Sequence, residues 1–194
     1  MTEKPYHHGN LQTELIEEGL ALIYEEGMEN FSLRKLVKRI GVSPTACYNH
    51  YKNIEELRNA MKEYVTKKFS EALVNSAKDV EDRYAAIEMG KEYVSFFAKH
   101  PHYFTFIYDN EEYSITLTEE TFDGDYEPFL RFKEIATGSL IALGIPPQRY
   151  RDNLIVMWAT VHGLAAMANM KGFHYKGDWK SLTEKILFEK LSLG

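Results

Sequence analysis

Small and hydrogen-bonding side chains are concentrated between residues 45 and 52 of this 194-residue chain. Thr45, Ala46 and Asn49 have the sizes and donor or acceptor groups that suit the edges of DNA bases in the major groove. Three neighbouring side chains can donate hydrogen bonds to phosphate oxygens: Tyr48, His50 and Lys52. This mixture indicates a surface that contacts both the bases and the backbone of DNA.

Two short helices are expected to hold these side chains in place. Ser32 has the residue type that caps a helix, and Gly41 has the type that ends one in the left-handed conformation. Ser43 and Pro44 mark a second helix over residues 44–51, because proline is tolerated at a first helical position. The pattern predicts a helix-turn-helix. The alternative is a helical hairpin in an ordinary core, which the narrow apolar face and the basic exposed face disfavour.

The charge of the chain is unevenly distributed along the sequence. The formal net charge is −6 overall, but residues 32–68 hold nine Lys or Arg and only three Glu. The positive charge therefore coincides with the predicted helix-turn-helix, as expected for a surface that binds phosphate. The alternative is a chance fluctuation of charge.

Composition limits the class of protein. The chain is 44% hydrophobic and has no run of 18 apolar residues, so no transmembrane helix is expected. The start of the sequence has no apolar segment typical of a signal peptide. The single cysteine, Cys47, excludes an intrachain disulfide, and a cytoplasmic location is expected. Cys47 could sense oxidation, but its spacing in the motif favours a buried and inert thiol.

Helical spacing continues through the remainder of the chain. The helices expected outside the motif cover residues 10–27, 53–77, 81–99, 102–108, 126–143, 148–171 and 179–192. We therefore predict an all-α fold with about nine helices. Residues 1–52 would form the DNA-binding domain, and residues 53–194 a ligand-binding and dimerisation domain that begins with the helix 53–77.

Residues 109–127 differ from their surroundings. They hold eight Asp or Glu and no Lys or Arg. We expect a solvated loop, because the spacing of the carboxylates does not fit an EF-hand calcium loop. No metal site and no cofactor are predicted.

Several segments resemble one known family. The sequences at 6–11 (Tyr-His-His-Gly-Asn-Leu), 41–44 (Gly-Val-Ser-Pro) and 48–51 (Tyr-Asn-His-Tyr), with Glu-Leu at 56–57, are similar to the N-terminal domain of TetR-type transcriptional regulators. Trp158, His162 and Gly163 resemble a Trp…His-Gly signature in the C-terminal domain of one TetR branch. The resemblance implies an all-α protein whose first three helices bind DNA, whose next helices enclose a ligand pocket and whose last two form a dimer interface.

The resemblance also assigns roles by position. Ser32 and Arg34 would open the first motif helix against the DNA backbone, and Tyr51 would be an aromatic core residue. The family commonly has lysine where this chain has Ile54, and Lys52 is close enough to replace that phosphate contact. The candidate DNA-binding residues are Ser32, Arg34, Ser43, Pro44, Thr45, Ala46, Tyr48, Asn49, His50 and Lys52.

Aromatic residues crowd the middle of the second domain. So many rings on short helices suggest a largely apolar cavity with a few polar groups, the usual form of a small-molecule site. The candidate ligand-binding residues are Phe96, Phe97, Phe104, Tyr108, Phe129, Trp158 and His162. Each ring taken alone is more typical of a packed core. The alternative favoured for His162 is a hydrogen-bonded core histidine beside Trp158.

Small residues on the segment 148–171 indicate a close helix–helix contact. Gly163, Ala166 and the apolar face of the segment 179–192 suit a four-helix bundle formed by two copies of the chain. The predicted function is a ligand-responsive homodimeric regulator, a repressor released from a palindromic operator by a small-molecule effector. The alternatives are an architectural DNA-binding protein without an effector, or an enzyme. The enzyme is disfavoured because no catalytic constellation is found in the sequence.

Overall fold

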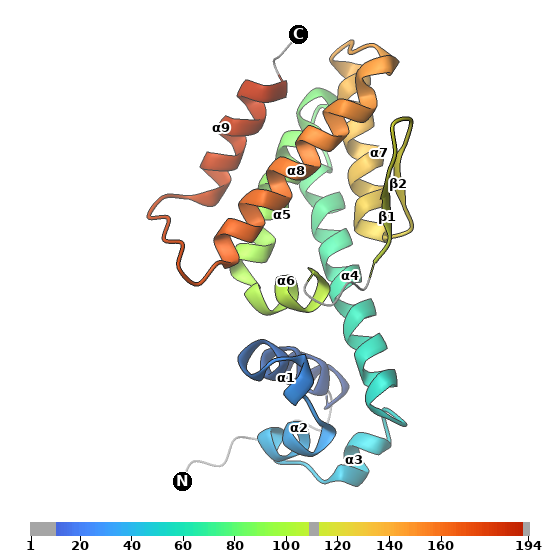
Figure 1. The fold of residues 1–194 in the computed structure, drawn as a ribbon, viewed down its shortest axis with the longest axis vertical. Coiled ribbons are helices and arrows are strands. Elements are labelled where there is room, and N and C mark those ends of the chain that lie inside the picture. Colours follow the sequence, from blue (N-terminus) through green and yellow to red (C-terminus); the bar gives the residue numbers. More distant parts are fainter. Residues whose placement is uncertain (1–10, 109–112, 192–194) are drawn as a thin grey trace. The chain divides into compact units, whose positions relative to one another are not determined.

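The structure is a computed structural model and describes residues 11–108 and 113–191. Nine α-helices and one two-stranded hairpin make up the described chain, which confirms the expected all-α fold (Figure 1). The chain divides into two compact units between Val65 and Thr66. A functional boundary at residue 52 stays a prediction. Among the described helices, none has both the length and the apolar character needed to cross a bilayer.

The first unit is built from four helical segments. They are α1 (Leu11–Glu26), α2 (Leu33–Ile40), α3 (Pro44–Tyr48) and the first half of α4 (Ile54–Ala77), with a 3-10 turn at Met28–Asn30. The second helix of the motif ends at Tyr48 and not at residue 51 as expected. The expected cap of the first helix, residue 10, lies outside the described residues.

The predicted caps account for how these helices begin and end. The hydroxyl of Ser32 accepts a hydrogen bond from the backbone N–H of Lys35 at 3.3 Å, and Ser43 accepts one from Ala46 at 3.2 Å. Gly41 has a φ of 81°, the left-handed conformation that glycine adopts without strain. The turn of the helix-turn-helix is therefore fixed by the residues that predicted it.

The core of the first unit is apolar and closely packed. Leu15, Leu36, Leu57 and Met61 have no exposed surface. A side chain at Gly19 would overlap the end of Met61, so the glycine permits α1 and α4 to approach each other closely. The buried faces of α2 and α3 are thus held by α1 and the first half of α4.

The second unit surrounds one central helix. Its elements are the rest of α4, α5 (Asp82–Lys99), α6 (Pro101–Tyr108), β1 (Ile115–Leu117), β2 (Phe122–Gly124), α7 (Glu127–Ala142), a 3-10 turn at Pro147–Arg149, α8 (Tyr150–Asn169) and α9 (Trp179–Leu191). Helix α5 packs against α7, α8 and α9. The buried hydroxyl of Ser139 on α7 accepts from the N–H of Ala86 and donates to the carbonyl of Asp82, which ties α7 to the first turn of α5.

The structure corrects the expected solvated loop at 109–127. Strands β1 and β2 pair antiparallel, with Ile115 opposite Gly124 and Leu117 opposite Phe122. Phe122 is 8% exposed and packs edge-on against Phe129 at 4.9 Å between ring centroids. The ring of Phe122 and the ion pair of Asp123 with Lys133 at 3.1 Å hold the hairpin to α7. The hydrogen bond from Arg151 to the carbonyl of Thr118 holds it to α8, although its tip is acidic. Residues 109–112 of the expected loop lie outside the described residues.

Candidate nucleic-acid interface and interior ligand site

Helix α3 has one buried side and one exposed side. Cys47 is 1% exposed and Tyr51 is 3% exposed, so these two side chains anchor the segment in the core. Thr45, Tyr48 and Asn49 lie on the opposite, exposed side. Burial raises the pKa of the Cys47 thiol, which makes it a poor nucleophile at neutral pH. The arrangement presents a short helix whose outer surface is free to enter a groove.

The other candidate DNA-binding residues fall around this helix. The side chains of Arg34, His50 and Lys52 are exposed, whereas Ala46 and Ser32 are half-buried. Ser32 and Ser43 use their hydroxyls as helix caps. The backbone N–H of Lys52 donates to the Glu56 carboxylate at 2.6 Å, which fixes the turn before α4. The contacts of these residues with DNA stay predictions.

Two of the four cations on α2 are paired with glutamates of α1. Arg39 binds Glu25 through two hydrogen bonds of 2.6 and 2.8 Å and binds Glu18 at 2.7 Å. Lys35 binds Glu26 at 2.6 Å. The Arg39 guanidinium lowers the pKa of the Glu25 carboxyl by hydrogen bonding.

This pairing refines the charge pattern seen in the sequence. Lys35 and Arg39 hold α2 to α1, whereas Arg34 and Lys38 are exposed. The net charge of a sequence segment cannot distinguish the paired cations of α2 from the exposed ones. The glutamates of residues 1–31 were the only signal in the sequence for these ion pairs. In a compact unit, some of them are expected to lie close to cations.

A further polar contact links α1 to α4. The hydroxyl of Tyr64 donates a hydrogen bond to the carboxylate of Glu17. Tyr64 belongs to the part of α4 that is included in the first unit, next to the division at Val65. The contact holds the first half of α4 to the helices that carry α3. The sequence pattern did not indicate this pair.

The seven candidate ligand-binding residues form one connected chain of ring contacts. Phe96 meets Phe97 at 5.3 Å, Phe97 meets Tyr108 at 5.5 Å, and Tyr108 meets His162 at 4.6 Å between centroids. Phe104 packs on Tyr108 at 4.9 Å. Trp158 joins His162 to Phe129. Most pairs are edge-to-face or tilted, a geometry that aromatic rings prefer.

Polar groups are gathered inside this cluster. The hydroxyls of Tyr93 and Tyr108 are 2.8 Å apart, and the Tyr93 hydroxyl is 3.1 Å from Nδ1 of His162. The His162 ring lies parallel to Trp158 with a centroid separation of 6.2 Å. Burial lowers the pKa of His162 and raises the pKa of Tyr93 well above its usual value, so both groups are uncharged at neutral pH. His162 is thus hydrogen-bonded beside Trp158.

The space beside the cluster is small. A cavity of about 10 Å³ is lined by Ala86, Met89, Gly90, Tyr93, Phe132, Met157, Val161 and Leu187. That volume is about the minimum for one water molecule. This cavity is too small for an effector. A ligand role for the seven residues stays a prediction.

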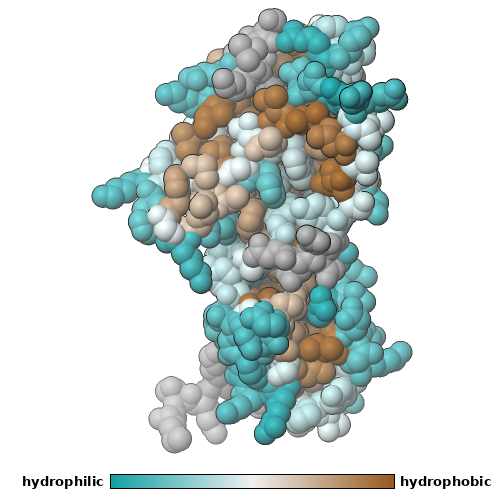
Figure 2. All heavy atoms as spheres, in the orientation of Figure 1, coloured by the Kyte–Doolittle hydropathy of each residue, from teal (hydrophilic) through white to brown (hydrophobic). Residues whose placement is uncertain are grey.

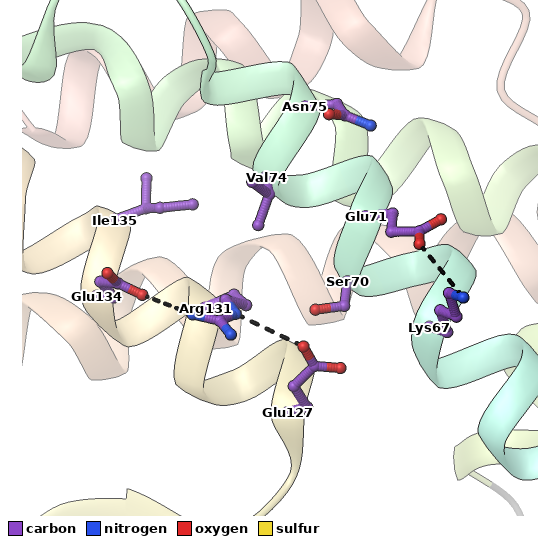
Figure 3. A pocket seen from close by; sticks show the side chains of 9 residues that line it. All are labelled: Lys67, Ser70, Glu71, Val74, Asn75, Glu127, Arg131, Glu134 and Ile135. Atoms are coloured by element: carbon purple, nitrogen blue, oxygen red, sulfur yellow. Dashed lines mark hydrogen bonds and ion pairs between the residues drawn. The ribbon is translucent and has the colours of Figure 1, made fainter.

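A larger hollow lies between α4 and α7. It has a volume of about 500 Å³ and is lined by Lys67, Ser70, Glu71, Val74, Asn75, Glu127, Arg131, Glu134 and Ile135 (Figure 3). None of these residues was a candidate from the sequence. The groove depends on the separation of two helices remote in sequence, which the spacing of apolar residues does not reveal.

Helices α8 and α9 expose apolar side chains. Val156 is 51% exposed and Phe188 is 57% exposed. Figure 2 shows hydrophobic side chains gathered over these helices on the face turned to the viewer. A Cβ added at Gly163 would meet no atom within 4 Å in the described chain outside its own helix backbone. The exposed surface of α8 and α9 therefore has room for helices of another protein chain to pack on it.

Comparisons with known proteins give matches over both units. Residues 15–61 match the family model described as bacterial regulatory proteins, tetR family. Residues 86–188 match the model described as tetracyclin repressor-like, C-terminal domain. A search of curated proteins gave no match.

Solved structures share the fold at low sequence identity. A TetR-like transcriptional regulator from Rhodococcus sp. RHA1 is 12% identical with a TM-score of 0.69, and the match covers 97% of this chain and 100% of that one. The TetR family regulator PfmR from Thermus thermophilus is 15% identical, with a TM-score of 0.65 and coverages of 89% and 93%. The regulator FadR from Bacillus subtilis, in complex with stearoyl-CoA, is 16% identical, with a TM-score of 0.61 and coverages of 93% and 97%.

Proposed function

The chain belongs to the TetR family of bacterial regulatory proteins, and we propose that this DNA-binding transcriptional regulator is a repressor released from its operator by a small-molecule effector. The observation that carries the proposal is the two-sided helix α3, with Cys47 buried and Thr45 and Asn49 exposed. Residues 1–52 would bind DNA, and residues 53–194 would bind effector and partner. The protein would act in the cytoplasm, where the DNA is.

Dimerisation supports binding to a palindromic operator. A five-residue recognition helix reaches few base pairs, so two half-sites would supply the missing affinity. The exposed Val156 and Phe188 and the open space at Gly163 support an interface through α8 and α9. Burying these apolar side chains against the same surface of a second copy would stabilise a symmetric dimer.

The fold is compatible with a small-molecule effector. FadR, whose fold resembles this one, is described in complex with stearoyl-CoA. An effector that binds more tightly to one arrangement of the second unit would shift the dimer toward that arrangement and weaken operator binding by the same coupling factor.

Fluorescence anisotropy with the DNA fragment upstream of the gene for this protein tests the proposal. We expect saturable binding that is much tighter than binding to unrelated DNA of the same length. A compound library is then screened for release of the fragment. Equal affinity for every fragment would argue for an architectural DNA-binding protein. Specific binding that no compound weakens would contradict regulation by a small-molecule effector.

A further inference from the structure

We propose that the groove between α4 and α7 binds an organic ammonium compound, meaning a protonated amine joined to a compact apolar body. The groove belongs wholly to the second unit. Binding of such a ligand in the groove does not depend on the regulatory role of the protein. The further step, that this ligand is the effector, rests on the proposed function.

The lining residues occupy matching faces of two helices. Lys67, Glu71 and Val74 follow the spacing of one face of α4, and Glu127, Arg131 and Glu134 follow that of one face of α7. In Figure 3 Val74 of α4 and Arg131 of α7 lie towards the space between the two helices, whereas Glu71 lies at its outer rim. A volume of about 500 Å³ is in the range of small-molecule sites.

A serine lies in the wall of this groove. Ser70 is 4% exposed as a residue and is one of the residues that line the groove. Figure 3 shows Ser70 on the side of α4 that borders the groove. A hydroxyl at the wall of an open groove can bond to water or to a ligand. The N–H of an ammonium group can donate to this oxygen.

The charged side chains at the groove favour a cation. Three carboxylates, those of Glu71, Glu127 and Glu134, face only two cations. Arg131 is shared between Glu134 at 3.1 Å and Glu127 at 3.6 Å. Lys67 lies 4.0 Å from Glu71.

Both cations therefore already have carboxylate partners, and one negative charge remains in excess. An anionic ligand would have to displace a carboxylate from Arg131 or Lys67. A cationic ligand meets the excess charge without breaking either pair. The attraction is modest, because Glu134 is 70% exposed and water screens it.

Apolar surface is available for the body of the ligand. Val74 is 42% exposed on α4, and Ile135 is half-buried on α7. The two side chains lie on opposite walls in Figure 3. A phenyl or short alkyl group between them would remove apolar surface from water, which is the main source of affinity at an open site. The amine would then determine which ligands are preferred, and the apolar body would supply most of the affinity.

The position of the groove suggests how occupancy could affect DNA binding. Its residues from Lys67 to Asn75 lie on α4, and the first half of that helix is held to α1 by the hydrogen bond between Tyr64 and Glu17. A ligand that changes the orientation of α4 would therefore act on the helix that continues into the DNA-binding unit.

Three probes of the same shape test the ligand class. They are 4-phenylbutylamine, 4-phenylbutanol and 4-phenylbutyrate, measured by calorimetry with the full-length protein. We expect the amine to bind most tightly and the carboxylate most weakly, with the difference shrinking as salt rises. Equal affinities, or tighter binding of the carboxylate, would overturn the proposal.

Variants of the groove test the location. Glu127→Gln and Glu134→Gln should each weaken the amine by about two- to fivefold, the usual size of an exposed ion pair, and should leave the alcohol unchanged. Glu119→Gln at the tip of the hairpin is the matched control and should change neither. Val74→Trp fills the groove from an exposed position and should abolish binding of amine and alcohol, whereas Val74→Ala should only weaken it.

The outcomes separate this site from the proposed function. Amine binding that the groove variants do not affect would place the site elsewhere and overturn the inference. Binding in the groove with unchanged operator affinity would keep the site and remove its role as effector site. Failure of all three probes, with circular dichroism confirming that the protein is folded, would overturn the site, while release by other compounds would still support the proposed function.

Discussion

Replacing single lysines near α3 should distinguish phosphate contacts from cations that only hold the fold. Lys52 is exposed at the turn before α4, where the structure leaves its side chain directed to solvent. Lys35 is paired with Glu26 of α1 at 2.6 Å. If the exposed surface around α3 faces DNA, Lys52→Ala should remove a phosphate contact and Lys35→Ala should not.

The size of the effect follows from counterion release. Each phosphate contact contributes about −0.9 to the slope of log affinity against log salt. A dimer on two half-sites loses two such contacts in Lys52→Ala, so the slope should become shallower by about 1.8. Between about 50 and 200 mM salt, that corresponds to a change of about twelvefold in the loss of affinity.

Anisotropy titrations at several salt concentrations measure the slope for both variants. Lys52→Ala should weaken operator and unrelated DNA about equally, because phosphate contacts carry no sequence information. Lys35→Ala should leave the slope unchanged and should instead lower the thermal stability of the first unit. Equal changes of slope in the two variants would refute the assignment of the phosphate-binding face. A change of about 0.9 in Lys52→Ala would indicate a single contact per complex.

Three more predictions concern base recognition, the dimer and pH. Asn49→Ala should relax the preference at particular base pairs by about 1–3 kcal/mol, whereas Tyr48→Phe should lower the affinity without changing the preferred sequence. Selection of binding sites from random DNA measures both effects. The reverse result would show that α3 is oriented differently on the DNA. A Cβ at Gly163 would meet no atom within 4 Å in the described chain. Gly163→Leu should therefore give a monomer, or a destabilised chain, in analytical ultracentrifugation, and a stable dimer would place the interface elsewhere. Burial lowers the pKa of His162 below its usual 6.5, so the unfolded chain binds more protons in acid, and stability should fall as pH drops below about 6.5. Urea denaturation should show less of this loss in His162→Gln, and an identical pH profile would contradict the assignment.

The helix-turn-helix was predictable because its signals are local. Ser32, Gly41 and Ser43 act on backbone groups within four residues of themselves, and such caps depend little on the remainder of the chain. The same applies to the buried position of Cys47, which follows from helical spacing. These features could be placed before any tertiary contact was known.

Features that depend on tertiary contacts were not predictable in the same way. The pairing of Arg39 with Glu18 and Glu25 requires α1 and α2 to cross at one register, and the sequence showed only opposite charges in neighbouring segments. The hairpin was mistaken for a loop because its acidic tip dominates the composition. Strand pairing, the buried ring of Phe122 and the ion pair of Asp123 with Lys133 fix the hairpin despite that composition.

The aromatic cluster shows why a count of rings cannot establish a cavity. The volume of a cavity depends on whether the rings interdigitate, and Phe97 of α5, Tyr108 of α6 and His162 of α8 are in edge-to-face contact. Opening this cluster would break the hydrogen bond between Tyr93 and Tyr108 and expose several rings at once. Any ligand that enters there must replace those contacts. The groove between α4 and α7 is already open, so a ligand can bind there without that loss of packing.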